Sequence, residues 1–262
     1  MSKTTLSPIL KNITPFGYHK TLSDCFERLK AQKKTAVFTP NSEMLYNAVK
    51  SEKIRDMLDS ADILFPDGAG IYMSMKALGF SPIERTAGIE LGERLLWESA
   101  KRGYRIFLLG AKKGVAEKAS RRLRTKYREL SICGCHHGYF EKCGKENDRV
   151  IDKINRSGAD IVFVCFGFPS QELWIKENIN RLTSAKLCLG LGGSLDVWSG
   201  DTRRAPETVS SLGLEWLWRT AKDPKRLNRL PSLFGFSLFT LKEYVKKHQK
   251  QYNCYEIDNF LK

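Results

Sequence analysis

Long apolar runs are missing from this chain of 262 residues. The longest one near its end, residues 233–241, is roughly half of the ~20 residues that a membrane-spanning helix requires. The first twenty residues also lack the continuous apolar segment and the small-residue cleavage site of a secretory signal. We therefore expect a protein that is made and kept in the cytoplasm.

Two ligand-binding patterns are absent as well. No Asp-x-Asp occurs, so the chain lacks the paired carboxylates with which many enzymes hold a divalent ion on a diphosphate. The glycine turn at 108–114 lacks the third glycine of the dinucleotide-binding fingerprint, so the evidence for NAD(P) is weak. We expect no metal ion and no cofactor, and a bound diphosphate would be neutralised by Arg, Lys and backbone amides.

A disulfide framework is not expected either. The seven cysteines are an odd number and are scattered along the chain, which suits reduced, partly buried thiols. An alternative is a zinc cluster built from Cys133, Cys135, His136, His137 and Cys143. Against it, Cys-x-Cys is tighter than the usual ligand spacing, and no second ligand pair follows.

Charge is plentiful and unbalanced. The chain carries 44 Lys and Arg against 29 Asp and Glu, a formal net charge of +15. An excess of this size predicts an anionic partner, which can be a nucleic acid, an acidic lipid or a phosphorylated substrate.

Strand-like and helical segments alternate through most of the chain. Short apolar segments predict strands at 35–39, 62–65, 104–109, 130–135, 160–166 and 186–191. Helical spacing predicts helices at 21–33, 42–50, 53–59, 69–78, 87–102, 115–127, 146–157 and 171–180. Residues 1–20 are expected to form an edge strand and a loop. This alternation is typical of an α/β fold, a Rossmann-like, largely parallel sheet flanked by helices, over residues 1–200.

Asp67 follows the buried apolar segment 61–65 and the turn residue Pro66. It therefore belongs at the carboxyl end of a strand, where open α/β sheets bind ligands. A matching strand end at 36–41 places Thr39 and Asn41 on the same edge. The alternative role for Asp67 is to cap the helix that begins near Gly68.

The other strand ends also carry residues suited to ligands. Gly110 opens a glycine turn into a helix, where backbone N–H groups can hold a phosphate. Gln171 lies at a helix start, where it can bind a sugar hydroxyl or a phosphate oxygen or cap the helix. Gly192 and Gly193 allow a ligand to approach the backbone closely, and Asp196 can accept hydrogen bonds from a nucleoside. Tyr139, in the polar loop 138–140, is a further expected substrate-binding residue.

The character of the sequence changes near Ser199. Residues 203–250 hold eleven Lys and Arg against four Asp and Glu, a net +7, interleaved with Leu, Trp and Phe. This composition favours a basic, amphipathic helical appendage over 201–262 that lies on an anionic membrane or a nucleic acid. The alternatives are a helical subdomain that packs its aromatics on the core and a surface for homo-oligomerisation.

Several of these segments together resemble the WecG/TagA/CpsF glycosyltransferase family. They are Thr39-Pro40-Asn41, Phe65-Pro66-Asp67-Gly68, Arg85-Thr86-Ala87-Gly88, Leu109-Gly110, Gly167-Phe168-Pro169-Ser170-Gln171-Glu172, Gly192-Gly193-Ser194-Leu195-Asp196 and Ala205-Pro206. The resemblance extends in order over residues 15–235. It implies an inverting, metal-independent hexosyltransferase that moves a sugar from a UDP donor onto polyprenyl-diphosphate-linked N-acetylglucosamine, at the inner face of the cell membrane.

The resemblance also implies roles for particular residues. Asp67 matches the catalytic base, and Thr39, Asn41, Arg85 and Gln171 match residues of the substrate pocket. In the appendage, Arg219, Arg226 and Arg229 match arginines that reach the diphosphate. The nucleotide is expected beside Gly192, Gly193 and Asp196.

The donor sugar stays open at this point. TagA-like members use N-acetylmannosamine in wall teichoic acid synthesis, WecG-like members use its uronic acid, and CpsF-like members act in capsule synthesis. We predict the first, with another UDP-sugar as the alternative. Two other classes remain as rivals: a non-catalytic, basic nucleic-acid-binding α/β protein and an NAD(P) oxidoreductase.

Overall fold

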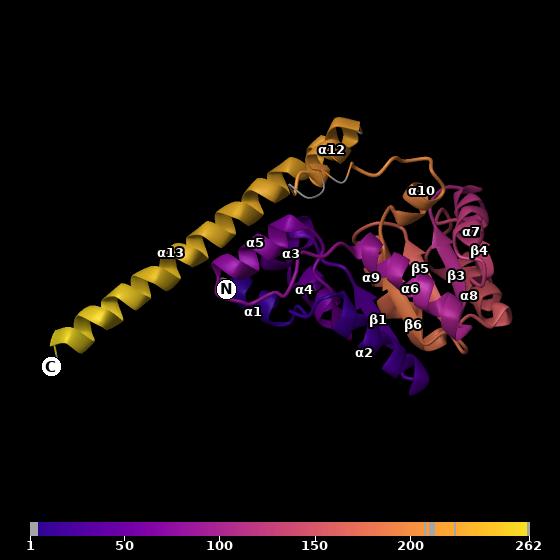
Figure 1. Cartoon of the computed structure of the whole chain (residues 1–262), viewed down its shortest axis with the longest axis horizontal. Helices are drawn as coiled ribbons and strands as arrows, with labels where there is room; N and C mark the ends of the chain where they lie inside the picture. Colours follow the sequence, from indigo (N-terminus) through magenta and orange to yellow (C-terminus); the bar gives the residue numbers. More distant parts are fainter. Residues whose placement is uncertain (1–4, 207, 210–212, 223, 261–262) are drawn as a thin grey trace.

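A computed structural model describes residues 5–206, 208–209, 213–222 and 224–260, apart from the side chains of residues 219, 222, 224–226 and 250–260. It contains one parallel six-stranded sheet in the order β2-β1-β6-β5-β3-β4 (Figure 1). The strands are β1 Thr35–Phe38, β2 Ile63–Leu64, β3 Arg105–Gly110, β4 Ser131–His136, β5 Ile161–Cys165 and β6 Leu187–Gly190. The predicted α/β fold with a parallel sheet is confirmed.

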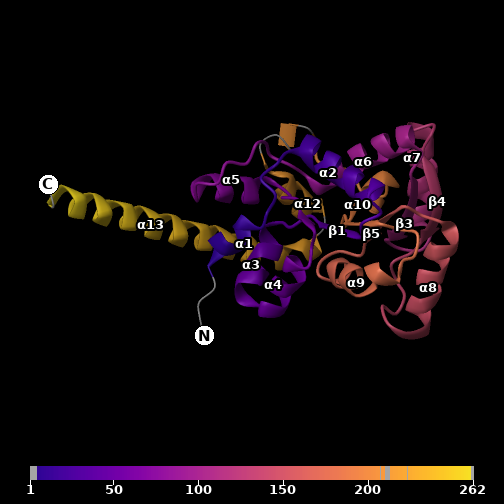
Figure 2. The same ribbon diagram turned by 90° about the horizontal axis from the view of Figure 1, so that it is seen from below.

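Helices connect the strands and extend beyond the sheet. The α-helices are α1 Leu6–Lys11, α2 Tyr18–Lys30, α3 Ser42–Lys50, α4 Glu52–Asp59, α5 Ala69–Ala77, α6 Gly88–Arg102, α7 Val115–Lys126, α8 Gly144–Ser157, α9 Ser170–Asn178, α10 Ser194–Trp198, α12 Glu215–Lys222 and α13 Leu230–Phe260. Two 3-10 helices are η1 Ile179–Arg181 and η2 Pro224–Arg229. Figure 2 shows α13 leaving the rest of the molecule and projecting far from the sheet.

The predicted edge strand is wrong for the described residues 5–20, which form helix α1, a short loop and the start of α2 instead. Leu6, Ile9, Leu10 and Ile13 follow the spacing of a helix face, and all four are buried in the same core cluster as Phe236 of α13. Helix α2 then begins at Tyr18, ahead of the predicted start at residue 21.

Alternating side chains of the strands divide the core into two layers. In β5, for example, Val162 and Val164 belong to one core cluster, whereas Ile161 and Phe163 belong to the other. Helices α1, α3, α4, α8 and α9 cover the first face, and α2, α6, α7 and α10 cover the second. Because both faces are covered, β1, β5 and β6 are buried along their whole length rather than on alternate residues.

At two places along the carboxyl edge of the sheet, neighbouring strands are followed by helices on opposite faces. Strands β1 and β6 are neighbours, but α3 follows β1 on one face and α10 follows β6 on the other. The same holds for the neighbours β5 and β3, which are followed by α9 and α7. In open α/β sheets such a reversal leaves a crevice in which ligands bind.

Candidate functional site

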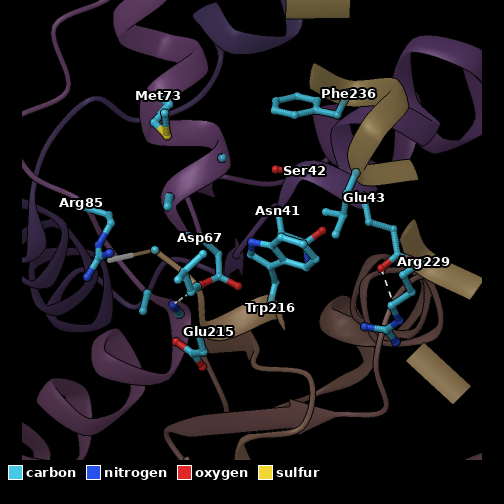
Figure 3. Close-up of a pocket in the computed structure, with 18 of the residues that line it drawn as sticks. Asn41, Ser42, Glu43, Asp67, Met73, Arg85, Glu215, Trp216, Arg229 and Phe236 are labelled. Carbon is cyan, nitrogen blue, oxygen red and sulfur yellow. Dashed lines mark hydrogen bonds and ion pairs between the residues drawn. The ribbon is translucent and has the colours of Figure 1, made fainter. Parts of the chain in front are cut away.

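A cavity of about 720 Å³ lies at the β1/β6 crevice. Its wall includes the turns after β1 and β2, the start of α6 and the turn after β6. Segments of α12 and α13 complete the wall from the other side (Figure 3). Among the expected site residues, Asn41, Asp67, Arg85, Gly193 and Arg229 line this cavity. Residues separated by more than 180 positions thus meet at one place.

Asp67 is held by the backbone of the turns around it. Its Oδ1 accepts a hydrogen bond of 2.9 Å from the N–H of Gly88, the first residue of α6, and its own N–H donates to Pro40 O at 2.8 Å. Asp67 therefore contacts the start of α6, 21 residues downstream. The cap position of α5 is Gly68. The alternative role of Asp67, as a cap for the helix that begins near Gly68, stays a prediction.

Asn41 and Arg229 approach the same cavity from opposite sides. Asn41 caps α3 by accepting a hydrogen bond of 3.1 Å from Met44 N. Arg229, at the end of η2, forms an ion pair of 3.5 Å with Glu43 of α3. Figure 3 shows Asn41 beside Asp67 and the Arg229–Glu43 pair to one side of them. This pair connects the segment before α13 to the strand-end residues.

Thr39 and Gln171 lie outside the lining of the cavity. Thr39 is buried and donates a hydrogen bond of 2.9 Å to Gly190 O, which links the ends of β1 and β6. Gln171 Oε1 accepts from Gly192 N at 2.8 Å and from Gly167 N at 3.2 Å. These two side chains hold the turns that form the wall, and direct contact with substrate stays a prediction for both.

Glu172 fixes the orientation of Gln171. The Gln171 amide nitrogen donates to Glu172 Oε1 at 2.7 Å, so the amide oxygen must face the two glycine N–H groups. Glu172 is fully buried, and its Oε2 has no hydrogen-bond partner. Burial raises the pKa of the Glu172 carboxyl from 4.5 to about 7. The sequence gives no local signal for such a buried acid, because Glu at a helix start is usually exposed.

The β5/β3 crevice holds other expected residues. Gly110 has a φ of 148° and packs so closely on Cys165 that a Cβ there would lie 2.4 Å from Cys165 O. Gly138 approaches the same turn and donates to Ala111 O at 2.8 Å. Tyr139 is 72% exposed beside it. The closely packed turns at Gly110 and Gly138 thus hold the backbone next to the exposed Tyr139 side chain.

Lys142 stabilises the loop that carries Tyr139. Its ammonium donates to Gly138 O and, at 2.9 Å, to Phe140 O, and it lies 4.2 Å from the centroid of the Phe166 ring. Burial lowers the pKa of Lys142 from 10.5 to about 8.

Asp196 lies in the first turn of α10, next to Gly193.

The start of α13 packs firmly on the core. Phe236 is buried, Phe239 stacks on Tyr46 with ring centroids 5.4 Å apart, and Ser74 and Thr240 share a hydrogen bond of 2.8 Å. Arg219 belongs to α12 and Arg226 to η2, but their side chains lie outside the described residues. Their predicted contact with a diphosphate stays a prediction.

Sequence reasoning missed a second polar group in the cavity wall. Glu90 of α6 accepts hydrogen bonds from Tyr18 Oη at 2.5 Å and from Arg204. Burial raises the pKa of Glu90, but the bonds from Tyr18 and Arg204 outweigh it and hold the pKa below its usual value. Glu90 and Arg204 both line the cavity. They are 114 residues apart, so no local motif connects them.

The remaining expectations concern a metal site and a membrane span. The described residues contain no group of three or more His, Cys, Asp and Glu side chains able to hold a metal ion, so residues 133–143 do not form the zinc cluster considered above. None of the helices, over the part of the chain that is described, is long and apolar enough to cross a membrane.

Comparisons with known proteins agree on one family. The model of the glycosyl transferase WecG/TagA/CpsF family matches residues 9–250. The chain is 35% identical over 211 residues to an N-acetylglucosaminyldiphosphoundecaprenol N-acetyl-beta-D-mannosaminyltransferase of Bacillus subtilis, covering 80% of both chains. It is 31% identical over 246 residues to a protein of the same name from Staphylococcus aureus, covering 93% of this chain and 91% of that one.

Proposed function

Because the chain belongs to the WecG/TagA/CpsF family of glycosyltransferases, we propose that it transfers N-acetylmannosamine from UDP-N-acetylmannosamine to polyprenyl-diphosphate-linked N-acetylglucosamine. Both relatives described above carry the name of such an N-acetylmannosaminyltransferase. Membership of the family makes the chain a glycosyltransferase rather than an NAD(P) oxidoreductase or a non-catalytic nucleic-acid-binding protein. The product belongs to cell-surface polysaccharide synthesis, for which wall teichoic acid linkage is the leading candidate.

The observation that carries this proposal is the position of Asp67. Its carboxylate lies in the wall of the cavity, and the N–H of Gly88 fixes its orientation. A carboxylate in this position can take the proton from the acceptor hydroxyl as that hydroxyl attacks the anomeric carbon. Attack from the face opposite the departing UDP inverts the anomeric configuration.

Arginines supply the second requirement of the reaction, because charge develops on the departing UDP. Arg85, Arg204 and Arg229 all line the cavity, and Arg204 and Arg229 would exchange their partners Glu90 and Glu43 for phosphate oxygens when the diphosphate binds. Arginine is suited to this role because its guanidinium contacts phosphate oxygens in a bidentate manner. We propose that Arg219 and Arg226 add to this group when the substrates are bound.

The nucleotide fits the β5/β3 side of the sheet edge. Gly110 and the glycines of the β6 turn provide close access to backbone, and Tyr139 provides an exposed ring for the uracil base. Asp196 follows Gly193 in the same region, where it can accept hydrogen bonds from the ribose. The donor would then extend from Tyr139 toward Asp67.

The appendage is proposed to seat the enzyme on the inner face of the cytoplasmic membrane. Residues 203–250 carry a net charge of +7, and each basic residue near an anionic leaflet contributes about 1 kcal/mol. Peripheral binding of this kind would bring a water-soluble donor and a lipid-linked acceptor together at one site.

A transfer assay tests the proposal directly. The full-length protein is given a short-chain lipid-diphosphate N-acetylglucosamine acceptor, several UDP-sugars in parallel and EDTA. Turnover with UDP-N-acetylmannosamine alone is the expected result. Turnover only with the uronic acid or with UDP-glucose would reassign the donor, and turnover abolished by EDTA would refute the metal-independent mechanism.

A further inference from the structure

The cavity at Asp67 is polar at one end and apolar at the other. Asn41, Asp67 and the Arg229–Glu43 pair form the polar end. Met73 and Ala77 of α5 and Leu233 and Phe234 of α13 also line the cavity and add apolar surface to it. Figure 3 shows Met73 on the side of the cavity that is remote from Glu215, with Asp67 between them. Such an apolar end does not match the polar groups of a sugar or a nucleotide.

Helices α5 and α13 run outward together from the polar end. Helix α5 begins directly after Asp67 and Gly68, and α13 begins directly after Arg229. Farther out, Ser74 meets Thr240, and Lys247 donates to Leu78 O at 2.7 Å. Later residues of one helix thus meet later residues of the other, so the two are parallel. We name the space between them, lined by Met73, Ala77, Leu233, Phe234, Ser237 and Thr240, the α5–α13 groove.

The groove presents large apolar side chains to solvent. Met73 is 67% exposed and Phe234 is 64% exposed, although both line a cavity. Beyond the groove, Leu238, Leu241 and Val245 continue from Phe234 along one face of α13, and all three are exposed. Apolar surface that is continuous and exposed in this way marks a binding site. The stretch of α13 from Leu230 to Thr240 is about 15 Å long at 1.5 Å per residue.

We infer that the α5–α13 groove binds the first isoprene units of the acceptor, those next to its diphosphate. This inference rests on the proposed function, since it requires a lipid-linked acceptor. The groups along the cavity match the parts of such a substrate. The sugar hydroxyl would lie at Asp67, the diphosphate near Arg229, and the apolar chain between Met73 and Phe234. The exposed face of α13 then leads the rest of the lipid toward the bilayer.

The test compares two acceptors in solution, without vesicles. Both carry diphosphate-linked N-acetylglucosamine, and one has a single isoprene unit whereas the other has several. The wild-type kcat/KM should be about tenfold or more higher with the longer acceptor, because each buried isoprene unit removes apolar surface from water. Met73→Ser and Phe234→Ser should each lower the value for the longer acceptor about tenfold and leave the shorter acceptor unchanged.

Two exposed residues outside the cavity lining provide matched controls. Ile83, at 70% exposure, matches Met73, and Phe16, at 42%, matches Phe234. Ile83→Ser and Phe16→Ser should leave the preference for the longer acceptor intact. Since all four side chains are exposed, none of these changes should disturb folding, which circular dichroism would verify.

Other outcomes would overturn the inference in distinguishable ways. A wild-type enzyme that uses both acceptors equally well would refute the groove while leaving the proposed function standing. Equal losses on both acceptors in Met73→Ser would place the residue's effect at the sugar or diphosphate. A shift in molecular mass in light scattering would make the groove a subunit interface. Failure of every acceptor, with UDP still bound, would refute the proposed function instead.

Discussion

The carboxyl edge of the sheet has two places at which the connections reverse, and different segments surround them. At β1/β6, segments of α12 and α13 add to the wall, and a cavity forms around Asp67. At β5/β3, glycine turns pack against each other and leave Tyr139 largely exposed. In Figure 1 strands β3 and β4 lie at the end of the molecule away from α13. Proton transfer benefits from a site that excludes water, whereas a nucleotide needs only close contacts. The difference is consistent with our proposal that the appendage serves the chemical step.

Asp67→Asn gives the strongest test of the proposal that the β1/β6 side serves proton transfer and the β5/β3 side serves nucleotide binding. Asparagine keeps an oxygen that can accept from Gly88 N, but it cannot take a proton, so kcat should fall about 10³-fold. UDP affinity by isothermal titration calorimetry should stay near that of the wild type. Asp196→Asn is the control from the other side and should weaken UDP binding more than it lowers kcat. Near-normal turnover in Asp67→Asn would show that another group is the base.

Phe236→Ala should loosen the packing of α13 beside the cavity at Asp67. Phe236 is only 2% exposed, and losing such a side chain costs about 3 kcal/mol of packing. If the start of α13 must stay docked for turnover, kcat/KM should fall about 100-fold. Leu238→Ala, two residues farther along the same helix and exposed, should have little effect. Full activity in a protein whose α13 has become sensitive to limited proteolysis would contradict the role given to the appendage.

Tyr139→Ala should affect only nucleotide binding at the β5/β3 side of the sheet edge. Loss of stacking on a base costs about 1–3 kcal/mol, so the Kd for UDP should rise about tenfold while kcat at saturating donor changes little. Phe16→Ala removes another exposed aromatic that does not line the cavity, and it should change neither value. An unchanged Kd in Tyr139→Ala would move the nucleotide away from this loop.

Glu172→Gln gives the smallest effect and tests the connection between the two sides, because Gln171 joins the turns after β5 and β6. The folded-state pKa of Glu172, about 7, lies above the usual 4.5, so the folded protein binds the proton more tightly than the unfolded chain does. Stability from this group is therefore fully present at pH 4 and is lost as the pH rises toward 7. The Tm of Glu172→Gln relative to wild type should be higher at pH 8 than at pH 5. Glu177→Gln, on the same helix, is the control, and a pH-independent difference would contradict the raised pKa.

Local sequence predicted the strand ends well but not what covers them. Asp67 and Asn41 follow short apolar segments that end in turn residues, so their place at the sheet edge followed from pattern alone. The buried role of Gln171 was not visible, because its partners Gly167 and Gly192 come together only in the folded sheet. Glu90 and Arg204 were missed for the same reason. The N-terminal segment was misjudged because Leu6, Ile9, Leu10 and Ile13 acquire a partner surface from α3 and α13, which local sequence does not reveal.

The first helix and the last one depend on each other. Helix α1 lacks a side-chain cap of its own at Thr5, and the N–H groups of Leu6 and Ser7 instead donate to the carboxylate of Glu243 in α13. The Ser7 and Glu243 partners are separated by 236 positions. During translation, α1 therefore leaves the ribosome long before its cap exists, because Glu243 is made 236 residues after Ser7. A nascent chain that stops short of α13 leaves α1 uncapped and the cavity without one wall, so transfer activity should appear only once synthesis has passed Glu243.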